Sequence, residues 1–234
     1  NRYIASGMED LYDIDGSLNE QKLETIGEQA GYPNKFDPNN IGDKDVIYIG
    51  ATTSRDVPKI MAIASQGSSL YIYEISPEMI QGKKGTICSG YWELTPETGL
   101  VEGKLPVATS AYFDRMFYYA VGNKIYRADL TRSTPRSYEI YAHPDPSVRI
   151  TRLKFRSQRE DRWDISGGDE VEAIPYDFVS YLGGVAEYPD GNCSMLEMKL
   201  TAAGEIDKEE GTKDLMVYEF KGFKNVVDFV YAFK

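Results

Sequence analysis

The sequence has very few of the residues that metal, disulfide and nucleophilic sites require. It contains 2 cysteines and 1 histidine in 234 residues. Zinc sites use four closely spaced Cys or His ligands, so we expect no metal and no cofactor. Cys88 and Cys193 are far apart in the chain, which leaves open a disulfide or two free buried thiols. Free thiols are the simpler interpretation.

Long apolar runs and positive charges are also scarce. No apolar stretch approaches the roughly 18 residues of a membrane span, so we expect no direct membrane insertion of this region. The chain has 26 Lys and Arg against 37 Asp and Glu, a formal net charge of −11. An acidic surface repels phosphate backbones, so nucleic acid is not an expected partner.

Tyrosine is abundant, with 18 Tyr against 9 Phe and 2 Trp. Aromatic and β-branched residues suit pleated, half-buried surfaces and favour strands. A strand-like segment, usually with a tyrosine, recurs four times along the chain. The copies are Leu11–Ser17, Leu70–Ser76, Ile125–Thr131 and Met195–Thr201. Such self-similarity is typical of repeat architectures.

Each copy has similar neighbours. Upstream strands are predicted at Lys59–Ser65, Met116–Val121 and Phe178–Tyr188, and more polar strands follow at Leu23–Gln29, Thr86–Leu94, Ser137–Ala142 and Leu215–Phe220. Apolar strands lie at Val46–Ala51, Ala108–Phe113, Ile150–Phe155 and Val226–Phe233. This order predicts an all-β fold, a β-propeller or propeller fragment with about four four-stranded blade units, as one domain over residues 1–234. The alternative is a β-sandwich.

The units are out of phase with the start of the sequence. No innermost strand precedes the first unit, and Val226–Phe233 could complete it, as in propellers closed by both chain ends. The alternative is that further blades precede Asn1. We interpret Asn19–Ala30 as strand and turn, and the insert Gln158–Asp177 falls outside the repeat.

Two stretches carry a family resemblance. Gly222–Tyr231, and Gly122–Arg127 with its following short strand, resemble the C-terminal part of PKD-like surface lipoproteins of Bacteroidetes. In that family, immunoglobulin-like modules precede a β-propeller-like region, and the proteins accompany glycan-uptake systems. The resemblance implies an extracytoplasmic location, at the outer-membrane surface or in the periplasm. It also implies an anchor in a preceding N-terminal region, a protein or glycan partner, and no catalytic residues to transfer.

Few local motifs point to chemistry. Asp13, Asp15 and Gly16 resemble the opening of a calcium loop, but an Asp-Gly turn after a strand is the favoured interpretation. Adjacent carboxylates such as Asp169 and Glu170 would point to opposite faces of a strand, so they make poor glycosidase pairs. We therefore expect no catalytic residues visible as local motifs.

Aromatic residues are the candidates for ligand binding, because a flat ring can stack on a sugar. Trp163 is the strongest candidate, since it lies in the polar insert where no strand pattern requires it. Its alternative is a loop anchor against the core. Tyr91 and Trp92 lie in a predicted strand, where cross-strand packing is the alternative.

The resulting hypothesis is a non-enzymatic extracytoplasmic binding or scaffold module of a surface lipoprotein, associated with glycan uptake. The enzymatic alternative is a propeller-type glycan-active hydrolase whose carboxylates come from different blades. The third candidate is a purely structural spacer.

Overall fold

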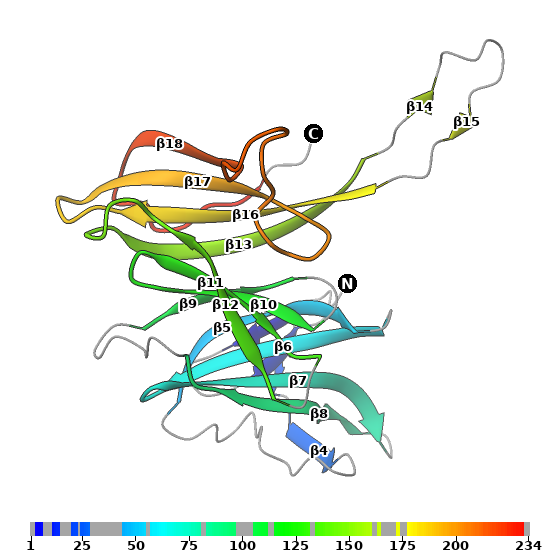
Figure 1. Cartoon of the computed structure of the whole chain (residues 1–234). Helices are drawn as coiled ribbons and strands as arrows, with labels where there is room; N and C mark the ends of the chain where they lie inside the picture. Colours follow the sequence, from blue (N-terminus) through cyan, green and yellow to red (C-terminus); the bar gives the residue numbers. More distant parts are fainter. Residues whose placement is uncertain are drawn as a thin grey trace.

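The structure is a computed structural model. It describes the backbone of residues 3–6, 11–14, 20–22, 24–28, 44–54, 57–80, 83–96, 105–111, 115–131, 134–160, 163–164, 172–173 and 177–231. Side chains are described for 44–50, 59–75, 89–96, 105–111, 115–131, 134–157 and 179–231. All regular structure in the described residues is β-strand, which confirms the predicted all-β class (Figure 1).

Three antiparallel sheets repeat the predicted four-strand unit. The first contains β5 (Asp45–Ser54), β6 (Val57–Gln66), β7 (Ser69–Ile80) and β8 (Lys83–Leu94). The second contains β9 (Val107–Ser110), β10 (Met116–Val121), β11 (Lys124–Asp129) and β12 (Arg136–Ala142). The third contains β13 (Arg149–Glu160), β16 (Asp177–Glu187), β17 (Asn192–Leu200) and β18 (Val217–Lys224). Neighbouring strands within each unit follow in chain order, so each unit is a meander.

Side-chain alternation explains how the sheets stack. In β10, Phe117 and Tyr119 belong to the core shared with the first sheet, whereas Met116 and Tyr118 belong to the core shared with the third. The middle sheet is therefore buried on both faces, which is why β10 has no charged residue. Burying one large apolar side chain such as Phe117 stabilises the fold by roughly 1.5–3 kcal/mol.

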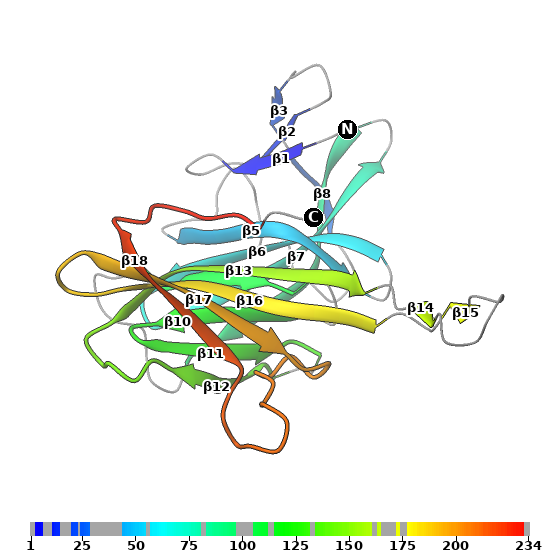
Figure 2. The same ribbon diagram turned by 90° about the horizontal axis from the view of Figure 1, so that it is seen from above.

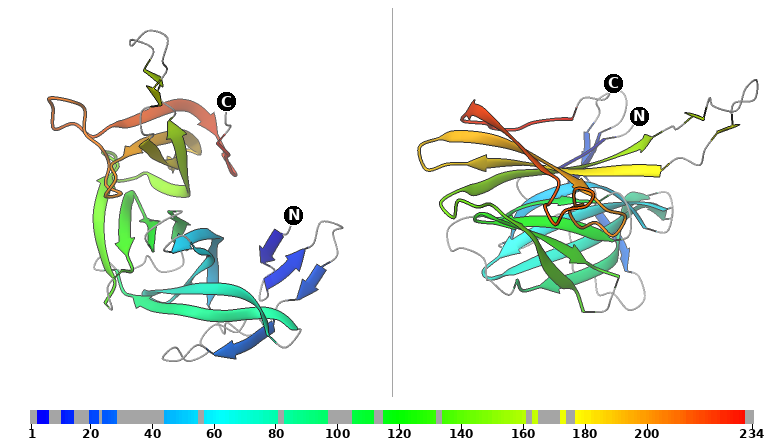
Figure 3. Two further views of the ribbon diagram at one scale, coloured as in Figure 1. Left: turned by 90° about the vertical axis from the view of Figure 1, so that its right-hand side faces the viewer. Right: turned by 45° about the horizontal axis from the view of Figure 1, so that its top comes forward.

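The sheets follow one another in an open arc, with β5, β9 and β13 as neighbouring first strands (Figure 3, left). Tyr48 Oη on β5 lies 2.7 Å from Ser110 Oγ on β9. Phe155 N on β13 donates to Thr109 Oγ1 at 3.3 Å. The repeated four-stranded sheets are thus confirmed, and the sheets of the described residues do not close into a ring.

The N-terminal strands differ from the prediction. β1 (Tyr3–Ser6), β2 (Leu11–Ile14) and β3 (Glu20–Lys22) form a separate antiparallel sheet (Figure 2). β4 (Glu24–Glu28), expected as the outer strand of that unit, instead pairs in parallel with β8. The reason is that β3 already occupies the edge of β2, which leaves β4 to pair with the open edge of β8. The predicted turn after β2 includes Asp15 and Gly16, which lie outside the described residues.

The structure shows where the insert Gln158–Asp177 lies relative to the repeated units. It extends the hairpin of β13 and β16 into an arm that carries the short pair β14 (Trp163–Asp164) and β15 (Glu172–Ala173) (Figure 1). The insert therefore adds no blade. It lengthens the connection between the first and second strands of the third sheet.

The C-terminal prediction was wrong in its strand assignment. Val226–Phe233 was expected to be an innermost strand, but the described residues 225–231 form no strand. Gly222 (φ 103°) is the extra residue at a bulge within β18, and Asn225 (φ 50°) turns the chain directly after β18. The segment that follows runs back over the third sheet. It is held there by side chains and has no ladder of backbone hydrogen bonds.

Candidate functional site

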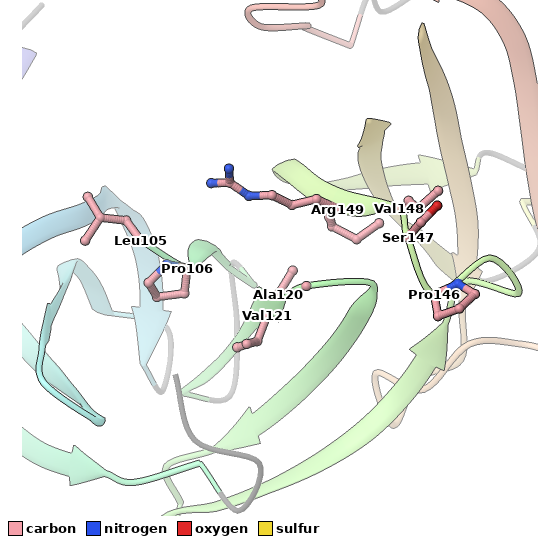
Figure 4. Close-up of a pocket in the computed structure, with 10 residues that line it drawn as sticks. Leu105, Pro106, Ala120, Val121, Pro146, Ser147, Val148 and Arg149 are labelled. Carbon is pink, nitrogen blue, oxygen red and sulfur yellow. The ribbon is translucent and has the colours of Figure 1, made fainter. Parts of the chain in front are cut away.

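A small cleft lies at the shared end of β9 and β13. Its volume is about 150 Å³. The walls come from the segment before β9, the β10–β11 turn and the segment leading into β13 (Figure 4). The lining residues are Leu105, Pro106, Ala120, Val121, Gly122, Pro146, Ser147, Val148, Arg149 and Ile150. The volume is below the ~300 Å³ of a typical small-molecule pocket, so the cleft suits one ring or an end group.

Backbone hydrogen bonds fix two walls of the cleft to each other. Ile150 N donates to Gly122 O at 2.8 Å, and His143 N donates to Asn123 O at 2.9 Å. Asn123 Nδ2 returns a bond to His143 O at 2.9 Å. Gly122 has φ 59°, the left-handed conformation that the predicted Gly122-Asn123 turn requires. The β10–β11 turn and the loop before β13 therefore behave as one rigid unit.

The loop that forms the far wall is braced internally. Asp145 Oδ1 accepts bonds from Ser147 Oγ at 2.7 Å and Ser147 N at 2.9 Å. These bonds from Ser147 hold the pKa of Asp145 below its usual value. Pro144 and Pro146 on either side restrict the backbone further. A ligand in the cleft would thus meet a wall that is already ordered, which lowers the entropic cost of binding.

Arg149 supplies the charge of the cleft. It is the first residue of β13, and its guanidinium reaches out over the cleft toward the Leu105 side (Figure 4). Within the described residues its side chain makes no ion pair or hydrogen bond. Leu105 opposite is half exposed, so the cleft presents a cation beside apolar walls. This combination can hold a carboxylate or a hydroxyl-rich ring.

His143 lies just outside the cleft and links the second and third sheets. Its side chain is 5% exposed, and Nδ1 accepts a bond from Asp145 N at 3.1 Å. The other ring nitrogen, Nε2, faces Glu219 Oε1 at 3.8 Å. Tyr188 Oη donates to the same oxygen at 3.0 Å.

The carboxyl of Glu219 is stabilised in its charged form. Burial acts against that form, but hydrogen bonds from Ser194 and Tyr188 hold the pKa of Glu219 below its usual value. Tyr141 and Tyr188 place their rings edge-on to the imidazole, at centroid distances of 6.4 and 5.9 Å. The cluster connects strands of two sheets, so it supports the loop behind the cleft.

Trp92 is buried in the core and is 8% exposed. It packs between the first and second sheets, and the Arg115 guanidinium lies 5.4 Å from its ring centroid. That environment matches the packing alternative. Tyr91 points to the opposite face of β8, is half-buried, and contacts Tyr73 with ring centroids 5.3 Å apart.

Trp163 lies on the arm, where it pairs with Ala173 in the β14–β15 ladder. Its side chain is outside the described residues, so its sugar-stacking role remains a prediction. The structure does not bring the three predicted residues together, because Trp92 and Tyr91 face opposite sides of β8 and Trp163 is on a different sheet.

Sequence reasoning missed Arg149, because the cleft depends on strands about 40 residues apart becoming neighbours. The only local signal was the rigid loop His143–Pro146, which lies next to the cleft. It also missed a row of exposed aromatic residues on β18, namely Tyr218, Phe220 and Phe223. They alternate with Glu219 and Lys221, so the strand looked like an ordinary polar outer strand.

No protein-family model matches the chain, and no characterised protein is found similar to it. Within the described residues, no three His, Cys, Asp or Glu side chains gather as metal ligands. That part of the chain also has no helix long and apolar enough to cross a membrane. Cys193 is a free, buried thiol, in line with the simpler interpretation of the two cysteines.

Proposed function

We propose that this chain is a non-enzymatic binding or scaffold module whose sheets are arranged as blades of a β-propeller. The observation that carries the proposal is the rigid cleft between the ends of two neighbouring first strands, with Arg149 at its mouth, whose side chain has no partner among the described residues. Ligand sites in barrels and related β-folds commonly lie at such strand ends.

The ligand we propose is the end group of a surface glycan. A pyranose ring has apolar C–H faces and polar edges, which complement Leu105 on one wall and Ser147 and Val148 on the opposite wall (Figure 4). Arg149 would bind the carboxylate of an acidic sugar or the hydroxyls of a neutral one. The extracytoplasmic location and the lipoprotein context rest on the family resemblance of the C-terminal stretch.

The test is calorimetry with matched oligosaccharides that end in glucuronate or glucose. Loss of a charge-assisted contact of roughly 1.5–3 kcal/mol predicts that R149M weakens glucuronate binding by about 10- to 100-fold. The control is K213M, which removes one positive charge from an exposed loop residue outside the cleft. Equal affinity of R149M and the native chain, or no binding of either sugar, would refute the glycan proposal.

A further inference from the structure

The third sheet has one face that no other described sheet covers. Its opposite face carries Leu153, Phe155, Leu182 and Leu196, which form the core shared with the second sheet. On the uncovered face, strand pairing aligns Arg152, Lys154 and Arg156 of β13 with Val185, Gly183 and Tyr181 of β16. Further across, β18 presents Tyr218, Phe220 and Phe223.

The C-terminal segment Val226–Tyr231 covers the β13 and β16 half of this face. Arg152 Nε donates to Val227 O at 2.6 Å, and Lys154 Nζ lies 2.8 Å from Asp228 Oδ1. The Arg156 guanidinium lies between two rings, 4.5 Å from the Tyr181 centroid and 4.6 Å from that of Tyr231. These contacts hold the segment along β13.

The contacts also show the direction of the segment. Positions 152, 154 and 156 of β13 meet 227, 228 and 231 in increasing order, so the segment runs parallel to β13. β9 and β13 run in the same sense, because residues 105–106 face 148–150 across the cleft while Thr109 bonds Phe155. The segment therefore occupies the place and direction of the next first strand in the arc.

The face also retains exposed aromatic surface of the kind that is buried between the other sheets. Tyr218, Phe220 and Phe223 are 42%, 54% and 43% exposed, and Val227 and Val230 of the segment are 76% and 80% exposed. The faces between the first and second sheets and between the second and third sheets meet each other and are buried. Exposed aromatic and aliphatic side chains gathered on one face are typical of an interaction surface.

We infer that the sheet β1–β3 docks on this surface and pairs with Val226–Tyr231 as its missing first strand. β1–β3 is a three-stranded antiparallel meander, one strand short of the repeated unit. The β1–β3 sheet lies at one end of the arc and the open face at the other (Figure 3, left).

Intramolecular docking is favoured over docking of a second copy. Two segments of one chain meet at a high effective concentration, on the order of millimolar for short connections, so a second molecule must compete with the tethered sheet. Among the described residues no strand pairs with the backbone of this segment, and β-sheet addition satisfies such an edge directly. The surface would thus close the arc of sheets into a ring.

Photocrosslinking identifies the occupant. p-Benzoylphenylalanine replaces Phe220 in one variant of the full chain and Val230 in another, and peptide mass spectrometry follows irradiation. We expect both to crosslink to a peptide within residues 3–22 at the mass of a single chain. Both positions are exposed, so the substitutions should leave folding intact. The crosslinking readout needs no ligand, so its result is independent of whether the cleft binds a glycan.

The control places the same probe at Tyr138, an exposed tyrosine on β12 that is 43% accessible. It should give no crosslink to residues 3–22. Crosslinks between chains, crosslinks to other segments, or the same products as the control would overturn the inference. Amide exchange of Val226–Tyr231 in the native chain gives a second measurement: slowed exchange supports a strand pair, and exchange at the unstructured rate contradicts it.

Discussion

Among the described residues, Glu74 is a carboxylate almost fully buried between the first and second sheets, so its partner Arg115 can be used to test how these sheets pack. The carboxylate is 1% exposed. Arg115 from the second sheet binds it with both ends of the guanidinium, Nε to Oε2 at 3.0 Å and Nη2 to Oε1 at 3.1 Å. Ser89, the extra residue at a β-bulge in β8, donates to Oε1 at 3.1 Å. The carboxylate is thus fully satisfied only when the two sheets are packed together.

Removing Arg115 should lower the free energy of unfolding by more than neutralising Glu74. Among the described residues, R115M leaves the Ser89 hydroxyl as the one donor to the buried Glu74 carboxylate. Removing one partner of a fully buried pair costs about 3–5 kcal/mol. Arg115 itself is 34% exposed, so water can partly replace it, and we expect about 2–3 kcal/mol. E74Q removes the buried charge and lets Arg115 turn to solvent, so its expected cost is smaller, about 1–2 kcal/mol.

Urea unfolding followed by far-UV circular dichroism measures both variants. With a slope of about 2–3 kcal/mol/M, R115M should lower the midpoint by about 1 M and E74Q by less. The double variant should lose less free energy of unfolding than the two single variants added together, because E74Q removes the charge that R115M leaves unpaired. A charge-matched control is K124M, which breaks the exposed pair with Glu139 and should leave the midpoint close to the native value. An E74Q variant less stable than R115M would refute the reasoning.

Two further predictions concern the third sheet. A Cβ at Gly183 would clash with Tyr231 Oη, whereas one at Gly184 would meet nothing closer than 3.5 Å. G183A should therefore displace the C-terminal segment and speed its limited proteolysis, while G184A should not; equal cleavage of both would contradict the contact. The lowered pKa of Glu219 means that its contribution is present above pH ~4.5 and is lost as pH falls through the folded-state value. The stability difference between the native chain and E219Q should shrink between pH 7 and pH 3 in urea titrations, and a constant difference would exclude that role.

The strands of the fold were predictable where local alternation and burial agree. Met116–Val121 was predicted with the bounds that β10 has, because an apolar run between turn signals has one natural interpretation. The order of strands within each unit was also predictable, since short turns such as Gly122-Asn123 force neighbouring strands to pair. Sheet-level stacking then follows from strands that are apolar on both faces.

The failures have a common physical cause. Leu23–Gln29 was predicted as the outer strand of the first unit by analogy with the other units, but pairing depends on which sheet edge is already occupied. Val226–Phe233 was predicted as a strand from its apolar composition, but the described residues 225–231 form no strand. Local sequence does not contain that information. The cleft was missed for the same reason: Leu105 and Arg149 become neighbours only because β9 and β13 lie side by side.

The uncovered face of the third sheet explains why the C-terminal segment is held by side chains. Arg152, Lys154 and Arg156 alternate along β13, so their backbones are about 6.8 Å apart on one face. Like charges at that distance repel by about 0.6 kcal/mol per pair in water, and more where solvent is excluded. The segment supplies each cation with a counterpart: the Val227 carbonyl, the Asp228 carboxylate and the Tyr231 ring. Docking of the segment is therefore partly electrostatic, and high salt should loosen it while leaving the apolar cores between the other sheets intact.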